Sequence, residues 1–493
     1  MAIPMANGQV IGAFDKVSDV NVIMTIVHPQ PVIGLGNMVI LNKVTERASL
    51  EGAKPEPIIS GFTLDPAAVT GKAGDVVTVQ VKDIAPKGAN SDLDVTSSDP
   101  KIATVAYNST KKGYDVTLLK DGAVLLTWTA ESGGMQKQQA VTVGDTAKAL
   151  TPAADVPGKE IEPSKDRTFS NELSNTDRMN GLLARKVDTT TGALYREYRN
   201  LDAVENDYGR DTLVYKKATA YFAQDYHSDR VAVIDYVDGQ LMPTLKSFLS
   251  FKWTFAIFSD NSINDETVLA SNIFEANADH FLVLQSDDLS DFNNCYGQNY
   301  TIALKHDVKE AMDAAFVGAI ATRPVGSTTW KFKVLKGITP EAVTTQERSG
   351  IDSVKAIAYI YSDGREETSE GWTLSGEYID LLHGVIWVNQ AVTKNLVDLL
   401  HNNDKLGYDH NGIAMVNSAI SDALLDAYNR KIIAEIGETG KGDYSVTTTP
   451  VEQQSKQDLS DRHYGGASFT YHASNAIHTI TVHGVVRSDT ILS

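Results

Sequence analysis

Apolar residues in the C-terminal part of the chain recur at helical spacing. Between 371 and 402, two consecutive series share this period and comprise Tyr378, Leu381, Leu382 and Val385, then Val392, Leu396, Leu399 and Leu400. A further stripe, with Asn411 as candidate N-cap and Gly437 as candidate stop, comprises Ile413, Val416, Ile420, Leu424 and Tyr428. These patterns predict helices that lie on a sheet, the last of them the longest.

The N-terminal part of the chain has the pattern of strands. Two short apolar runs, 20–27 and 39–44, each predict a strand. From about 58 to 143, short alternating strands separated by turns follow, clearest at 76–81, 102–105, 114–118 and 123–128. Regular spacing of this kind predicts a β-sandwich. Residues 145–175 are polar and poor in large apolar groups, which is typical of a linker.

The middle of the chain alternates between the two periods. Helices are expected at 201–209, 212–223, 241–251 and 264–276. Apolar runs predict strands at 230–236, 254–258, 280–284, 315–320 and 330–335. This alternation predicts an α/β layer. The fold class is therefore a multidomain α+β or α/β protein with mixed sheets and helices and one all-β insertion.

Length, composition and charge narrow the class of protein. A chain of 493 residues that is 42% apolar and 22% charged is expected to form about three or four globular domains. No run approaches the roughly 18 apolar residues of a spanning helix, so membrane insertion is not expected. The N-terminus lacks the pattern of a secretory signal, so we expect the chain to stay in the cytoplasm of the producing cell unless lysis releases it. A net charge of −19 argues against nucleic-acid binding.

Several short motifs resemble chemical sites but have the wrong spacing. The run 437–443 has a Gly-Lys pair without the Ser or Thr and the following helix of a phosphate loop, and Gly34-Leu-Gly36 lacks a third glycine. His478 and His483 are five residues apart, so they face opposite sides of one strand, and no ligand lies at metal spacing beside them or His472. Cys295 is a lone cysteine, and the acidic run 286–294 lacks a calcium-loop pattern. We predict no catalytic residue, no cofactor and no metal.

Three segments taken together resemble the contractile-tail sheath proteins of bacteriophages. They are Gly371-Trp-Thr-Leu-Ser-Gly-Glu-Tyr-Ile-Asp380 with Val385-Ile-Trp387, the run Leu399-Leu-His-Asn-Asn-Asp-Lys-Leu-Gly-Tyr-Asp-His-Asn-Gly-Ile413, and Asp461-Arg-His-Tyr-Gly-Gly-Ala-Ser-Phe-Thr470. The resemblance covers roughly 1–50 and 190–493, and the order and spacing of the segments carry it. Its family-motif residues are Gly371, Ser375, Gly376, Glu377, Tyr378, Ile379, Asp380 and Trp387. Near Gly465 the usual basic or alanine-rich run is replaced by Asp-Leu-Ser-Asp-Arg-His-Tyr.

The resemblance implies a structural protein and no enzyme. Sheath protomers form stacked six-membered rings around a tail tube, contract, and drive the tube through a cell envelope. Neighbouring protomers are linked by terminal strands that complete one another's sheets. The residues expected to make this strand exchange are Val20, Val22, Ile23, Thr25, Ile26, Val27, Ile477, Thr479, Ile480, Thr481, Val482, Val485 and Val486. The implied partners are other copies of the chain, the tube protein, and the baseplate and tail-terminator proteins.

A second resemblance concerns the predicted sandwich. Leu64-Asp-Pro, Val95-Thr-Ser-Ser-Asp-Pro-Lys-Ile-Ala-Thr-Val105 and Gly122-Ala-Val-Leu-Leu-Thr-Trp-Thr-Ala130 resemble bacterial immunoglobulin-like domains of group 2. Val95 stands where a tryptophan is often found, and host-surface glycans are a candidate ligand. The expected organisation is an N-terminal arm with the first strands of the sheath core at 1–53, the inserted sandwich at 54–146, and a linker with re-entry into the core at 147–190. An α/β sheath domain follows at 191–345, and a C-terminal sheath domain with the terminal exchange strand at 346–493.

Two other classes of protein compete with a sheath. A surface adhesin would use the immunoglobulin-like segment, but it needs a signal peptide and an anchor or tandem modules, and the sequence shows none. An enzyme on an α/β core is the second alternative, since that fold class supports many activities. A tube protein is disfavoured because tube subunits are much smaller. The resemblance places the chain in the tail of a phage particle, assembled in the host cytoplasm, with viral genome ejection as the process it serves.

Overall fold

The computed structural model describes residues 35–51, 59–86, 93–108, 111–130, 135–144, 147–157, 167–320 and 322–479. The predicted strand at 20–27 lies outside these residues, as do residues 480–486 of the predicted terminal strand. Within the described part of the chain, no helix is both long enough and apolar enough to span a membrane.

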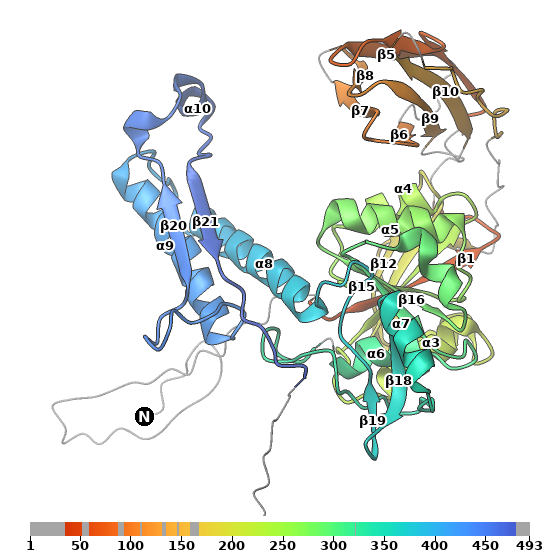
Figure 1. Ribbon diagram of the computed structural model, residues 1–493, viewed down its shortest axis with the longest axis vertical. Helices are drawn as coiled ribbons and strands as arrows, with labels where there is room; N and C mark the ends of the chain where they lie inside the picture. The colour runs from red at the N-terminus through yellow and green to blue at the C-terminus, as the bar shows by residue number, and fades with distance from the viewer. Residues whose placement is uncertain are drawn as a thin grey trace, which may run out of the picture. The chain divides into compact units, whose positions relative to one another are not determined.

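A nine-stranded sheet forms the centre of the fold (Figure 1). In spatial order its strands are β12 (Leu182–Val187), β13 (Leu194–Tyr198), β14 (Val231–Val237), β1 (Met38–Val44), β15 (Phe255–Phe258), β16 (Phe281–Ser286), β17 (Thr301–Lys305), β18 (Ala356–Ser362) and β19 (Arg365–Thr368). The six strands from β14 to β18 run parallel, and the outer pairs are antiparallel. Every residue of β14, β15 and β16 is buried, as expected for parallel strands covered on both faces.

Helices cover this sheet, and several of them begin at side-chain caps. They are α1 (Asn175–Met179), α2 (Leu201–Tyr208), α3 (Leu213–Phe222), α4 (Leu241–Phe248), α5 (Asp265–Asn277), α6 (Met312–Ile320) and α7 (Thr345–Ser353), with a short 3-10 helix, η2, at Leu289–Cys295. Asn264 and Thr344 form capping boxes at the starts of α5 and α7. Helix α4 packs against α5, and α3 packs against α6. The mixed α/β architecture predicted from the alternating pattern is confirmed.

Two strand predictions are wrong. Residues 315–320 belong to α6, all nine residues of which are buried, and 330–335 form no strand. A short continuous apolar run fits a buried helix as well as a buried strand, so its periodicity cannot decide between them. The segment at 330–335 is apolar because Trp330 and Leu335 are buried in the core, not because the backbone is extended in the sheet.

Residues 59–144 form two four-stranded sheets that share one hydrophobic cluster. The first contains β4 (Val69–Gly71), β10 (Gln136–Val143), β9 (Gly122–Ala130) and β6 (Leu93–Ser97). The second contains β3 (Gly61–Asp65), β5 (Val76–Ala85), β8 (Gly113–Leu118) and β7 (Ala103–Asn108). Trp128 is fully buried in the cluster and donates from Nε1 to Gln139 Oε1 at 3.1 Å. Val95 pairs directly with Trp128, so the indole comes from the neighbouring strand and not from position 95.

The strands that flank the segment with these two sheets lie next to each other. Strand β2 (Ser49–Leu50) lies before it and strand β11 (Thr168–Phe169) lies after it, and the two pair in parallel. Ser49 Oγ and Thr168 Oγ1 are 2.9 Å apart. Leu50 and Phe169 pack on a small cluster of Ala48, Val187 and Leu194. The two ends of the intervening segment are therefore neighbours.

The last part of the chain consists of a helical pair and a small sheet. Its elements are α8 (Ile379–His401), α9 (His410–Asn429), β20 (Tyr444–Thr448), a 3-10 turn η3 (Val451–Gln453), α10 (Lys456–Asp461) and β21 (Ala467–Tyr471). The predicted helices are present, but both predicted ends of α9 are wrong. Asp409, not Asn411, is the N-cap, because its Oδ1 accepts from Gly412 N at 2.9 Å. The helix ends at Asn429, since Lys431 has a φ of +65°, and Gly437 lies in a later turn.

Candidate assembly site

The motif that begins at Gly371 joins the central sheet to α8. A Cβ on Gly371 would lie 2.9 Å from Trp330 Cβ, so only glycine allows the chain to pass this close to the indole. Leu374 N donates to Thr301 O at 2.9 Å, and Ile379 N donates to Gly371 O at 2.9 Å. These bonds fix the first turn of α8 to the end of the sheet, so this helix starts from a rigid base.

The remaining motif residues form a turn, the start of α8 and a contact in the core. Ser375, Gly376 and Glu377 form a tight turn in which Gly376 has a φ of +91°. Trp387 is 4% exposed and stacks under the Arg430 guanidinium at 4.9 Å. Burial raises the pKa of the Asp380 carboxyl.

His383 of the same motif is a buried histidine among aromatic rings. Its ring centroid lies 5.4 Å from Phe255 and 6.2 Å from both Phe281 and Trp330. Its Nε2 atom has no hydrogen-bond partner among the described residues. Burial lowers its pKa to about 3, because the apolar surroundings disfavour the imidazolium.

Replacing His383 by phenylalanine is expected to reduce the loss of stability in acid. The unfolded chain binds a proton on this histidine below its ordinary pKa of 6.5, whereas the folded chain stays neutral until about pH 3. Stability from this group is therefore present above pH 6.5 and falls as the pH is lowered. Between pH 7 and pH 5 the wild type should lose about 2 kcal/mol more than His383→Phe. Urea unfolding at the two pH values measures the difference, and equal losses in both proteins would contradict the assignment.

Strands β20 and β21 form a separate two-stranded antiparallel sheet with a clear division of faces. Val446 pairs with Phe469 and Thr448 with Ala467, while Ser445 pairs with Thr470 on the opposite, polar face. Both strands contact α9. Within the described residues each strand has one paired edge only, so each offers a row of backbone N–H and C=O groups on its outer side. Open edges of this kind have the geometry to pair with an added strand, and we call the pair of β20 and β21 the acceptor sheet.

The chain that follows β21 returns to the central fold before the terminal segment begins. Ser474 N donates to Ile432 O at 2.9 Å. His478 Nδ1 lies 3.0 Å from Glu370 Oε2, its Nε2 lies 2.8 Å from Thr329 Oγ1, and its ring meets the Tyr378 ring edge-on at 4.7 Å. Ile477, on one side of it, is 78% exposed. His478 is thus held by three contacts one residue before the end of the described chain at Thr479.

The anchor of His478 includes a buried ion pair that sequence reasoning missed. Lys331 and Glu370 form this pair, and their side chains are 9% and 10% exposed. Arg348 Nη2 lies 4.0 Å from the same carboxylate. The two partners are 39 residues apart in the sequence, and neither belongs to a periodic pattern. In the sequence, the only indication that Glu370 is part of the structural core was its position directly before Gly371.

Of the predicted exchange residues, the structure describes only Ile477 and Thr479, which are exposed and lie outside any strand. The other predicted residues, Val20 to Val27 and Ile480 to Val486, fall outside the described part. No group of three or more His, Cys, Asp or Glu side chains among the described residues could hold a metal ion. His472 is beside Asp443 and His478 beside Glu370, so these two histidines have separate carboxylate partners. Cys295 is buried, and burial raises the pKa of its thiol.

Solved structures similar to this chain include a baseplate, a sheath complex and a sheath tail protein. The baseplate of the anti-feeding prophage matches at 13% identity with a TM-score of 0.46, over 56% of this chain and 82% of that chain. The sheath of an extracellular contractile injection system, in its contracted state, matches at 11% identity with a TM-score of 0.46, over 59% and 86%. The sheath tail protein of Desulfitobacterium hafniense matches at 10% identity with a TM-score of 0.32, over 92% and 100%. No family model matches the chain, and no curated protein matches it.

Proposed function

We propose that this chain is the sheath protein of a contractile phage or phage-like tail. In this proposal it polymerises as stacked hexameric rings around a tail tube and contracts to drive the tube through a cell envelope. Its partners are other copies of itself, the tube protein, and the baseplate and terminator proteins. It performs no reaction and needs no cofactor.

The observation that carries the proposal is the two-stranded sheet of β20 and β21, whose two outer edges are unpaired among the described residues. An isolated two-stranded sheet is marginal in water, and it gains stability when further strands pair with it. The chain supplies two β-rich terminal segments, 20–27 and 477–486, that fit this role. A contact in which one copy donates and the next accepts does not close on itself, so it generates a stack.

The same proposal assigns a role to each remaining segment. The N-terminal strand residues and Ile477 to Val486 pair with β20 or β21 of adjacent copies. The Gly371 motif sets the base of α8, which carries α9 and the acceptor sheet. Residues 59–144 are proposed to be a group-2 immunoglobulin-like insertion, and host-surface glycans are its candidate ligand. The assembled polymer is part of the tail of the particle and forms in the host cytoplasm.

Electron microscopy of the purified full-length chain tests the function directly. We expect hollow cylinders or stacked rings with six-fold symmetry, formed at raised protein concentration or on a tube. Size-exclusion chromatography in the same buffer gives the fraction of free monomer. A chain that stays monomeric or forms a closed small oligomer under all conditions, with tube protein present, would refute the proposal.

A further inference from the structure

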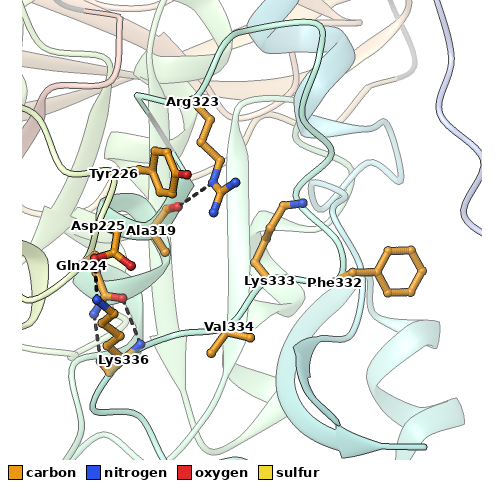
Figure 2. A pocket seen from close by; sticks show the side chains of 9 residues that line it. All are labelled: Gln224, Asp225, Tyr226, Ala319, Arg323, Phe332, Lys333, Val334 and Lys336. Atoms are coloured by element: carbon orange, nitrogen blue, oxygen red, sulfur yellow. Dashed lines mark hydrogen bonds and ion pairs between the residues drawn. The ribbon is translucent and has the colours of Figure 1, made fainter.

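A surface pocket of about 280 Å³ lies where α3 and α6 end and the segment at 332–336 passes (Figure 2). One lining residue, Phe332, also borders the anchor of His478, since the two rings meet edge-on at 6.4 Å. One side contains an ion pair between Lys336 and Asp225. The other side contains Arg323 and Lys333, and their charges are the unusual feature of the pocket.

The Arg323 guanidinium is held in place without an acidic partner. Its carbon lies 3.7 Å from the centre of the Tyr226 ring, and its Nε donates to Ala319 O at 3.1 Å. No Asp or Glu among the described residues lies within ion-pair distance of it. Figure 2 shows the guanidinium between the Tyr226 ring and the Lys333 side chain. A guanidinium fixed by stacking and one backbone bond still presents its terminal N–H groups for bidentate binding of a carboxylate.

Lys333 adds a second cation with no partner of its own. It is half-buried, and its backbone bonds to Thr368, but no hydrogen bond or ion pair joins its Nζ to another described residue. Its pKa is lowered by burial and then by the positive charge of Arg323, and Asp380 offsets these effects only in part. Two neighbouring positive charges in a chain of net charge −19 are costly unless an anion compensates them.

Apolar groups stand beside the two cations. Phe332 is 46% exposed and Val334 is 61% exposed. Phe332 also has a φ of +63°, a backbone conformation that is unfavourable for a bulky residue. Figure 2 shows the Phe332 ring beyond Lys333, pointing away from Arg323, so the apolar groups lie at the rim of the pocket. Exposed aromatic and aliphatic side chains around an arginine are typical of protein contacts. A small free anion would satisfy the charges but leave these apolar groups in water.

We propose that this pocket receives an aspartate or glutamate side chain of an adjacent copy of the chain. The partner is a second copy because the chain carries 63 acidic against 44 basic residues, so its surface presents carboxylates to any neighbour. The carboxylate binds between Arg323 and Lys333, and apolar atoms beside it cover Phe332 and Val334. This inference rests on the proposed polymer and identifies one contact in it that does not depend on strand exchange.

The test compares a neutralised pocket with a matched control of equal charge. Arg323→Gln/Lys333→Gln removes both cations of the pocket. Lys72→Gln/Lys101→Gln removes two exposed lysines elsewhere, so both variants change the net charge by the same amount. The protein concentration needed for polymerisation should rise about tenfold or more in the pocket variant and little in the control. Thermal unfolding of both variants checks that each is folded.

A photo-crosslinker placed at Val334 in the full chain provides an independent readout. In assembled sheaths we expect a cross-link to a second copy, on a peptide that contains Asp or Glu. The inference is overturned if the wild type polymerises and the pocket variant does so at the same concentration, or if the cross-link joins the tube protein. If the wild type itself never polymerises, the proposed function fails and this contact fails with it.

Discussion

A chain shortened by deletion of residues 480–493 should fold, remain monomeric and form no sheaths. The deletion leaves His478 on Glu370 and Thr329, so the described fold and the root of the terminal segment stay intact. It removes most of the predicted donor strand. Each backbone hydrogen bond adds about 1 kcal/mol net, and a strand along the five-residue edge of β20 or β21 forms several of them at every copy.

Sedimentation and electron microscopy at matched concentrations measure this loss. Deletion of residues 55–146 is the control, because it removes a longer segment whose two ends are joined by β2 and β11. We expect the control to polymerise like the wild type. Sheaths of normal length from the chain without 480–493 would refute the donor strand. Failure of the control alone would mean that the removed segment takes part in ring contacts.

Glu370→Gln should destabilise the central fold by about 3 kcal/mol. The substitution leaves Lys331 as a buried ammonium without its charged partner, and breaking a buried pair on one side costs about 3–5 kcal/mol. The substitution also replaces the carboxylate that contacts His478 by a neutral amide, which is a weaker hydrogen-bond acceptor. One of the two polar contacts of His478 is therefore weakened. We expect both a lower urea midpoint and faster proteolysis after Tyr471.

Two further variants test whether the loss of stability comes from leaving a buried charge unpaired. Lys331→Met/Glu370→Leu removes both charges together and should be close to the wild type in stability, since neither charge remains unpaired. Asp398→Asn breaks the exposed pair with Lys394 and should cost less than about 1 kcal/mol. A Glu370→Gln protein as stable as Asp398→Asn would show that the pair at 331 and 370 is not desolvated.

The sequence predicted best the elements that have either a helical period of buried residues or a short apolar run rich in β-branched residues. Strand β14 and helices α5 and α9 have long apolar patterns, and α5 also has its cap at Asn264. Helix α6 was mistaken for a strand because all of its faces are buried. The sheet order could not be predicted, since β1 pairs with two strands that begin about 190 and 215 residues later.

The candidate site was predictable only where it follows from local pattern. The Gly371 motif was found because its residues are contiguous, and its turn and helix start depend on near neighbours. The pair of Lys331 with Glu370 and the grouping of Tyr226, Arg323 and Lys333 depend on tertiary packing. The spacing of charged residues along the sequence does not indicate which of them become neighbours in the fold. The sequence likewise did not indicate that β20 and β21 have unpaired edges, because strand pairing is known only in the folded structure.

The parallel pairing of β2 with β11 creates a site at which a folded domain can be inserted into the chain. Ser49 and Thr168 lie side by side, so whatever is encoded between them begins and ends at a single spot. Any foreign unit with adjacent termini meets the same geometric requirement. In the polymer proposed above, a unit grafted there would be repeated once per subunit.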